Sequence, residues 1–125
     1  MIYLLDTHTL LWWFDDPQQL SGPARAAVAD TRNEILVSAA TGWEIAIKRG
    51  LGKLTAPVDL ESAIRQSGFR ELPITLEHAL TIERLPVHHR DPFDRLLIAQ
   101  AIVETATLIT RDAELATYGV PILPA

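Results

Sequence analysis

Short apolar runs separated by longer amphipathic stretches are the feature that most constrains how this chain can fold. The runs are too short for helices. Because they are apolar throughout rather than alternating, they are typical of strands buried on both faces of a sheet. They lie at Ile2–Leu5, Ile35–Val37, Leu108–Ile109 and near Val120–Leu123, with Phe69–Leu72 as a further candidate.

The stretches between the runs have the apolar spacing of helices, and Gly50 and Gly68 stand where helices should stop. The expected helices cover Thr9–Phe14, Pro23–Ala29, Ala39–Arg49, Leu60–Gln66, Leu76–Leu85 and Pro92–Thr105. Buried strands that alternate with helices predict an α/β fold, in which helices cover both faces of a mostly parallel central sheet in a three-layer α/β/α arrangement.

Size, cysteine content and charge narrow the possible functions. We expect a single domain over residues 1–125, because no linker or repeat divides the chain. The absence of cysteine excludes disulfide scaffolds and thiolate sites and is compatible with a cytoplasmic location. No apolar run approaches the roughly 20 residues of a membrane span, and Asp6 interrupts any signal peptide. The net charge of −5 means that nucleic-acid binding would need local positive patches.

Acidic residues occupy the positions where a ligand site is expected. Asp6 follows the first strand, and Thr110 and Asp112 follow the strand at 108–109. Ligands of open parallel sheets bind beyond the carboxyl ends of the strands, so these residues predict a site at that edge. Two more acids lie on helix stripes expected to face inward: Glu44 with Ala40, Ile47 and Leu51, and Asp94 with Leu97, Ile98, Ala101 and Ile102.

Four carboxylates at one edge need a counter-charge. Each pair about 6 Å apart repels by roughly 3 kcal/mol at an effective dielectric constant near 20. The sum over the quartet rivals the stability of a whole domain, about 5 to 15 kcal/mol. The cluster must therefore protonate in part or bind a cation. Oxygen ligands favour Mg²⁺ or Mn²⁺, ions that activate water in phosphate chemistry.

Each acid also has a purely structural interpretation. Asp6 could end its strand in a turn, Asp94 could complement a helix dipole, and Asp112 could cap a short helix through Ala116. Glu44 could form a buried ion pair with Lys48 at i+4. For Asp91 we prefer the structural role, because Asp-Pro at a helix start explains it as an N-cap.

Four segments together resemble a known family. They are Asp-Thr at 6–7, Trp-Glu-Ile-Ala-Ile-Lys at 43–48, Asp-Pro-Phe-Asp-Arg-Leu-Leu-Ile-Ala-Gln-Ala at 91–101 and Thr-Arg-Asp at 110–112. They resemble the PIN-domain nucleases, most of all the VapC-type toxins of prokaryotic toxin-antitoxin pairs, from Met1 to about Leu123. The resemblance implies a PIN-like fold and RNA cleavage by water attack. It implies that Asp6, Glu44, Asp94 and Asp112 are catalytic acids that hold Mg²⁺ or Mn²⁺, with Thr110 beside the metal-bound water.

The resemblance also implies partners: an RNA substrate, a cognate antitoxin that covers the site, and commonly a second copy in a homodimer. The stretch Leu10–Phe14 is apolar around its whole circumference, so that helix is either an interface or fully covered. Residues that could hold RNA phosphates are Lys48, Arg49, Lys53, Arg90, Arg95 and Arg111. For Arg95 and Arg111, pairing with the same carboxylates is an equal alternative. His88 and His89 could contact RNA or form plain surface.

Two other functions compete with a ribonuclease. Haloacid-dehalogenase-like phosphatases also place a catalytic Asp after the first strand, in a pattern Asp-x-Asp, but the third position here is His8. A non-catalytic module could keep the acids only to bind a basic partner, although one arginine needs only one or two carboxylates.

Replacing Asp6 or Asp94 by asparagine is expected to abolish RNA cleavage while preserving or raising stability, because the loss of one charge relieves repulsion among the acids. Cleavage assays and urea unfolding check both parts. A marked loss of stability in both variants would identify these acids as structural.

Overall fold

Five parallel strands form the central sheet of the computed structural model, which describes residues 1–88 and 91–125. Their order is β3-β2-β1-β4-β5, and every neighbouring pair is parallel. The strands are β1 (Ile2–Leu5), β2 (Glu34–Ser38), β3 (Arg70–Leu72), β4 (Thr107–Thr110) and β5 (Ile122–Pro124). The predicted α/β fold with buried parallel strands is therefore confirmed.

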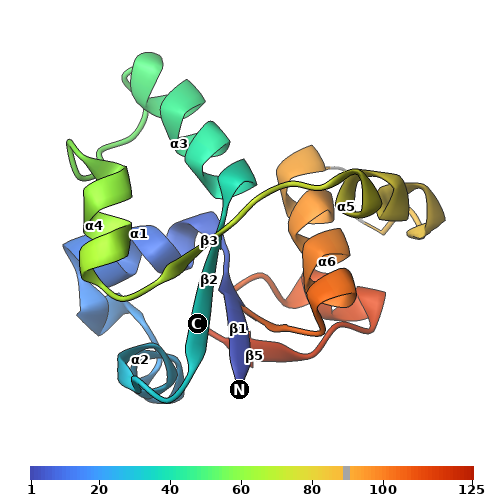
Figure 1. The fold of residues 1–125 in the computed structure, drawn as a ribbon, viewed down its shortest axis with the longest axis horizontal. Coiled ribbons are helices and arrows are strands. Elements are labelled where there is room, and N and C mark those ends of the chain that lie inside the picture. Colours follow the sequence, from blue (N-terminus) through green and yellow to red (C-terminus); the bar gives the residue numbers. More distant parts are fainter. Residues whose placement is uncertain (89–90) are drawn as a thin grey trace.

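Helices cover both faces of this sheet, as Figure 1 shows. They are α1 (Thr7–Asp15), α2 (Gly22–Ala29), α3 (Ala39–Gly50), α4 (Leu60–Gln66), α5 (Leu76–Thr81) and α6 (Pro92–Glu104), with 3₁₀ turns η1 (Pro17–Gln19), η2 (Ile82–Arg84) and η3 (Ala113–Tyr118). None of the described helices is long and apolar enough to cross a membrane.

Alternation along the strands divides the core between the two faces. Leu5 of β1, Val37 of β2 and Ile109 of β4 are in register and pack against α1, α2 and α4. Leu4, Leu36 and Leu108 point to the other face and pack against α6. Both faces are apolar, so these strands read as continuous apolar runs in the sequence.

Most predicted boundaries agree with the structure to within two residues, and the differences have local causes. Helix α3 continues through Gly50, and Gly52 instead adopts the left-handed backbone, with φ 70°. Gly68, with φ 79°, follows the end of α4 as predicted. The expected helix at 76–85 divides into α5 and η2. The last strand begins two residues later than expected, because Val120 packs into the core ahead of the β4–β5 ladder.

The predicted inward stripe of α3 is correct only for its first turns. Ala40 and Glu44 are buried, but Ile47 is 42% exposed and Leu51 is 64% exposed. The second half of α3 projects beyond the sheet (Figure 1), so the sheet does not cover these two side chains. On α6, Leu97, Ile98 and Ala101 are buried as predicted, whereas Ile102 is exposed.

Helix α1 is covered only in part. Leu10 and Leu11 are buried, and Trp12, Trp13 and Phe14 pack against the same core. The Trp13 ring lies 6.0 Å from that of Phe69, and the Arg111 guanidinium lies 4.0 Å over the Trp12 ring. Leu10 and Leu11 are therefore covered within the chain, whereas Trp12, Trp13 and Phe14 are only partly buried.

A buried polar link connects the start of α3 with α6. The Ser38 hydroxyl accepts from the amide of Ala40 and donates to Gln100 Oε1 at 2.5 Å. Gln100 Nε2 donates to the Pro73 carbonyl at 3.4 Å, and both Ser38 and Gln100 are buried. This link sets the spacing of the two helices that carry Glu44 and Asp94.

Gln100→Leu is expected to lower the free energy of unfolding by about 1–3 kcal/mol, because the Ser38 hydroxyl and the Pro73 carbonyl lose a buried partner. Urea unfolding measures the change. Gln66→Leu on the exposed face of α4 is the control and should change stability by no more than about 0.5 kcal/mol. Equal stability of the two variants would contradict the role given to Gln100.

Candidate active site

Asp6 lies at the junction of β1 and α1, where its carboxylate is buried. Its Oδ1 accepts from the amide of Thr9 at 2.8 Å, which caps α1. Its Oδ2 accepts from the Thr110 hydroxyl at 2.5 Å, and that hydroxyl accepts from the amide of Asp112 at 3.1 Å. Thr110 thus connects the acid that follows β1 with the acid that follows β4.

Glu44 is the second buried carboxylate and lies in the second turn of α3. Its Oε1 accepts from the Thr7 hydroxyl at 2.6 Å, and its Oε2 lies 2.5 Å from Lys48 Nζ. The Thr7 hydroxyl oxygen also lies 3.4 Å from that of Thr41. Thr7 is a site residue that the sequence did not predict, although it stands directly after Asp6 at the start of α1.

Asp94 lies half-buried in the first turn of α6. Asp91 caps this helix as predicted, accepting from the amides of Phe93 at 2.9 Å and Asp94 at 3.3 Å. The Phe93 ring meets the Trp43 ring of α3 edge-on, with centroids 5.0 Å apart. Each aromatic residue immediately precedes an acid, so this contact brings the Glu44 turn and the start of α6 together.

Lys48 interacts with acids from both helices. Its hydrogen bond to Glu44 raises the pKa of the Lys48 ammonium, while partial burial lowers it. The charges of Glu44, Asp91 and Asp94 raise that pKa further. The ammonium therefore lies in the negative potential between α3 and the N-terminus of α6.

Asp112 caps η3 and accepts from the amide of Glu114 at 3.0 Å. The structural interpretations of Glu44, Asp91 and Asp112 are thus observed as contacts, whereas Asp6 caps α1 and does not merely end its strand in a turn. They do not exclude metal binding, because each carboxylate has about four lone-pair directions and these contacts use only some of them.

The four acids, Asp6, Glu44, Asp94 and Asp112, offer only oxygen ligands, which suit a divalent cation such as Mg²⁺ or Mn²⁺. As the side chains stand, however, no three His, Asp or Glu residues within 1–88 and 91–125 are grouped closely enough to hold one ion. The four-acid ligand set therefore stays a prediction. It requires side-chain movement, including that of Lys48, which lies 2.5 Å from one oxygen of Glu44.

The arginines near the acids have structural partners. Arg95 donates to the carbonyls of Pro86 at 2.9 Å and Ile82 at 3.3 Å. Arg111 donates to the carbonyls of Gln19 and Ala125 and covers Trp12. Both guanidiniums connect loops, a role that proximity in sequence to the acids did not predict.

Two of the other predicted contact residues also have structural partners. Arg49 donates to the Pro57 carbonyl at 2.7 Å, and the His88 ring lies 5.2 Å from that of Tyr118. Lys53 is exposed. His89 and Arg90 lie outside the described residues.

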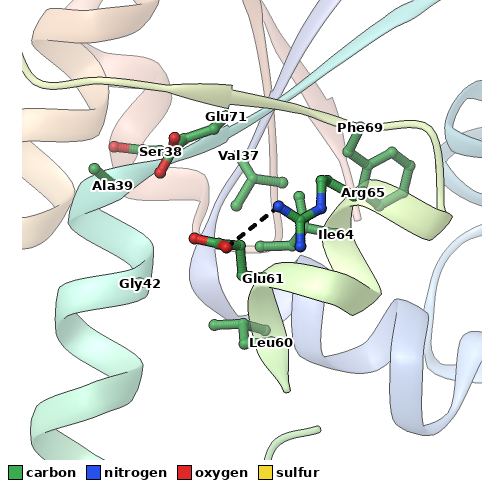
Figure 2. A pocket seen from close by; sticks show the side chains of 10 residues that line it. All are labelled: Val37, Ser38, Ala39, Gly42, Leu60, Glu61, Ile64, Arg65, Phe69 and Glu71. Atoms are coloured by element: carbon green, nitrogen blue, oxygen red, sulfur yellow. Dashed lines mark hydrogen bonds and ion pairs between the residues drawn. The ribbon is translucent and has the colours of Figure 1, made fainter.

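A pocket of about 480 Å³ lies between α3 and α4, against β2 and β3 (Figure 2). Its apolar lining comes mainly from Val37, Ile64 and Phe69, and the Glu61–Arg65 ion pair, at 3.3 Å, lies within it. Asp6, Glu44, Asp94 and Asp112 do not line this pocket. The acidic edge and the pocket are therefore separate features.

Comparison with known proteins identifies relatives over nearly the whole chain. A family model described as the PIN domain matches residues 3–121. Over 121 residues the chain is 32% identical to Ribonuclease VapC22 of Mycobacterium tuberculosis, covering 94% of this chain and 92% of that relative. Ribonuclease VapC16 of the same organism is 45% identical over 62 residues, which cover 48% of this chain and 44% of that relative.

Solved structures support the fold. VapBC2 from Rickettsia felis, bound to a DNA fragment from its promoter, gives a TM-score of 0.74 at 19% identity over 98% of both chains. FitAcB from Neisseria gonorrhoeae gives a TM-score of 0.71 at 21% identity over 99% of this chain and 97% of that chain. At such identities the likeness concerns the three-layer architecture alone.

The contacts of Asp6 change the stability expected for Asp6→Asn. Both carboxylate oxygens accept hydrogen bonds, whereas asparagine has one oxygen and an amide donor that would face the Thr110 hydroxyl or the amide of Thr9. We therefore now expect Asp6→Asn to lose stability, contrary to the expectation from charge relief alone. The expectation for Asp94→Asn is unaffected.

Thr110→Val is expected to lower the free energy of unfolding by about 1–3 kcal/mol, because Asp6 and the amide of Asp112 both lose a partner. Thr110→Ser retains the hydroxyl and should recover most of this loss. Chemical denaturation measures both, with Thr55→Val at an exposed position as the control. If the serine variant is as unstable as the valine variant, the hydroxyl has no such role.

Proposed function

This chain belongs to the PIN-domain family, and from that premise we propose that it is a metal-dependent endoribonuclease acting as the toxin of a toxin-antitoxin pair. The 32% identity to Ribonuclease VapC22 over nearly the full length of both chains supports the activity. The observation that carries the proposal is the pair of buried carboxylates, Asp6 and Glu44, which threonine hydroxyls hold at the carboxyl edge of the parallel sheet.

The proposed ligands of Mg²⁺ or Mn²⁺ are Asp6, Glu44, Asp94 and Asp112. When bound, such an ion activates a water for attack on the phosphodiester and neutralises charge on the phosphate. A site of this kind needs the cation for a second reason. RNA phosphates are repelled by unneutralised carboxylates, and the chain as a whole carries a net charge of −5.

The remaining residues orient these acids. Thr110 and the amide of Thr9 fix both oxygens of Asp6, and Thr7 fixes one oxygen of Glu44. The Asp91 cap keeps Asp94 in the first turn of α6, where amides that lack helical partners favour negative charge. Thr110 is thus proposed as a positioning residue that also lies beside the attacking water.

Lysines are the better candidates for holding RNA phosphates. Arg95 and Arg111 donate to backbone carbonyls of neighbouring loops, so their release would disturb those loops. Lys53 is exposed, and Lys48 extends from the edge of the acid site toward solvent. Contacts of this kind position the backbone of an RNA without selecting its sequence.

Two protein partners belong to the proposal, a cognate antitoxin and a second copy of the chain. Apolar side chains that are exposed in the single chain support these partners, because a protein interface would bury them. They are Trp43, Ile47 and Leu51 on α3 and its C-cap, and Leu76 and Leu80 on α5. The structural relatives, whose names include VapBC complexes, share the fold. The proposed RNA substrate would be met in the cytoplasm.

The phosphatase alternative receives no support, because His8, in place of the second acid, is exposed and lies 5.7 Å from the Trp12 ring. The binding-module alternative is favoured by one observation, the Lys48–Glu44 pair, which shows that the acids can satisfy a basic group. A protein that binds its partner tightly but cleaves no RNA in Mn²⁺ would establish that alternative.

Purified protein is expected to cleave an end-labelled mixed RNA pool with Mg²⁺ or Mn²⁺ and to leave it intact in EDTA. Asp94→Asn should reduce cleavage by on the order of 100-fold or more, because a direct ligand contributes at least as much as an outer-shell partner. Asp15→Asn, which removes an exposed carboxylate at the end of α1, is the matched control and should cleave normally. Cleavage that persists in EDTA, or equal loss in both variants, would contradict the metal site.

A further inference from the structure

Glu44 depends on Lys48 for its counter-charge. The Glu44 side chain is 8% exposed, so water cannot solvate its charge, and Lys48 Nζ lies 2.5 Å from Oε2. The Lys48 side chain is 42% exposed and approaches from the solvent side. Ion pairs at i+4 are common on helix surfaces and weak there. This one differs because the carboxylate is buried and, in our proposal, a metal ligand.

The same ammonium lies near the acids of α6. Asp91 and Asp94 both raise the pKa of Lys48, and the Trp43–Phe93 contact keeps the two helices together at this point. A positive charge of the protein itself therefore acts on Glu44 and Asp94, two of the four carboxylates that the proposed function assigns to a divalent ion.

We propose that Lys48 is a built-in competitor for the divalent cation, holding Glu44 until a metal ion displaces it and thereby setting the metal affinity of the site. The inference rests on the proposed function, because it takes Glu44 as a metal ligand. It goes further, because Lys48 is not one of the four acids and yet controls how tightly they bind the metal ion.

The competition follows from charge and geometry. An ammonium and a divalent ion repel each other strongly when both lie within a few ångströms of one carboxylate oxygen. Lys48 can leave, because lysine has a flexible four-carbon stem and a strongly hydrated head, and the side chain already reaches solvent. Thr7 keeps its hydrogen bond to the other oxygen, so Glu44 stays oriented while Oε2 changes partners.

The test is a calorimetric titration of metal-free protein with Mn²⁺, supported by the electron paramagnetic resonance signal of free Mn²⁺. Lys48→Met should bind Mn²⁺ about 10-fold more tightly than the unaltered chain, which corresponds to about 1.4 kcal/mol. Lys48→Arg, which keeps the charge, should not tighten binding. Arg65→Met removes the cation of an exposed i,i+4 ion pair, Arg65–Glu61, away from the acids and serves as the matched control.

Thermal unfolding in EDTA gives a second readout. Lys48→Met should melt at a lower temperature than the unaltered chain, because the buried carboxylate of Glu44 loses its positively charged partner. Glu44→Gln combined with Lys48→Met should recover much of that loss. If Lys48→Met does not fold, Lys48→Gln replaces it, since glutamine is uncharged and can still donate a hydrogen bond to Glu44.

Unchanged or weaker Mn²⁺ binding in the uncharged variants would overturn the role of Lys48. The proposed function survives that result if the unaltered chain still binds Mn²⁺ and Asp94→Asn weakens the binding. If the unaltered chain binds no Mn²⁺ and cleaves no RNA, the proposed function itself is wrong, and the role of Lys48 fails with it.

Discussion

A buried carboxylate must receive hydrogen bonds from its surroundings, and this requirement organises the carboxyl edge of the sheet. Asp6 receives one from the first turn of α1 and one from the end of β4, while Glu44 receives one from α1 and one from within α3. The donors for these two acids thus come from three elements. If any one of those elements moved, a charge would be left buried without its partner, at a cost of several kcal/mol.

The candidate site and the fold are consequently built from the same contacts. Asp6, Asp91 and Asp112 each cap a helical segment in addition to any role toward a metal ion. Substitutions at these positions therefore change stability and chemistry together, and a loss of activity alone does not separate the two. Glu44 has no capping role, which makes it and Lys48 the more informative pair for dissecting the site.

The sequence was sufficient for the architecture, because strands buried on both faces appear as apolar runs and Asp-Pro or Asp-Thr mark helix starts. Periodicity identified the inward face of α3 but not the point where the sheet ends, so Ile47 and Leu51 were wrongly placed inside. The i+4 spacing predicted Lys48 as a possible ion-pair partner of Glu44, and the structure contains that ion pair. The partners of Arg95 and Arg111 were unpredictable, since they are backbone carbonyls, which no side-chain pattern in the sequence marks.

The position of β1 in the centre of the sheet has a consequence for synthesis of the chain. Its neighbour β4 lies about a hundred residues later, and the hydrogen bond from Thr110 to Asp6 closes a separation of 104 residues. Contacts between residues so far apart in the sequence form late and make folding slower. Chains also begin to fold from the N-terminus while they are still on the ribosome. A nascent chain that stops short of β4 therefore has Asp6 without Thr110 and lacks Asp112 altogether. An incomplete translation product therefore lacks part of the proposed four-acid set, which is complete only when Asp112 has been made.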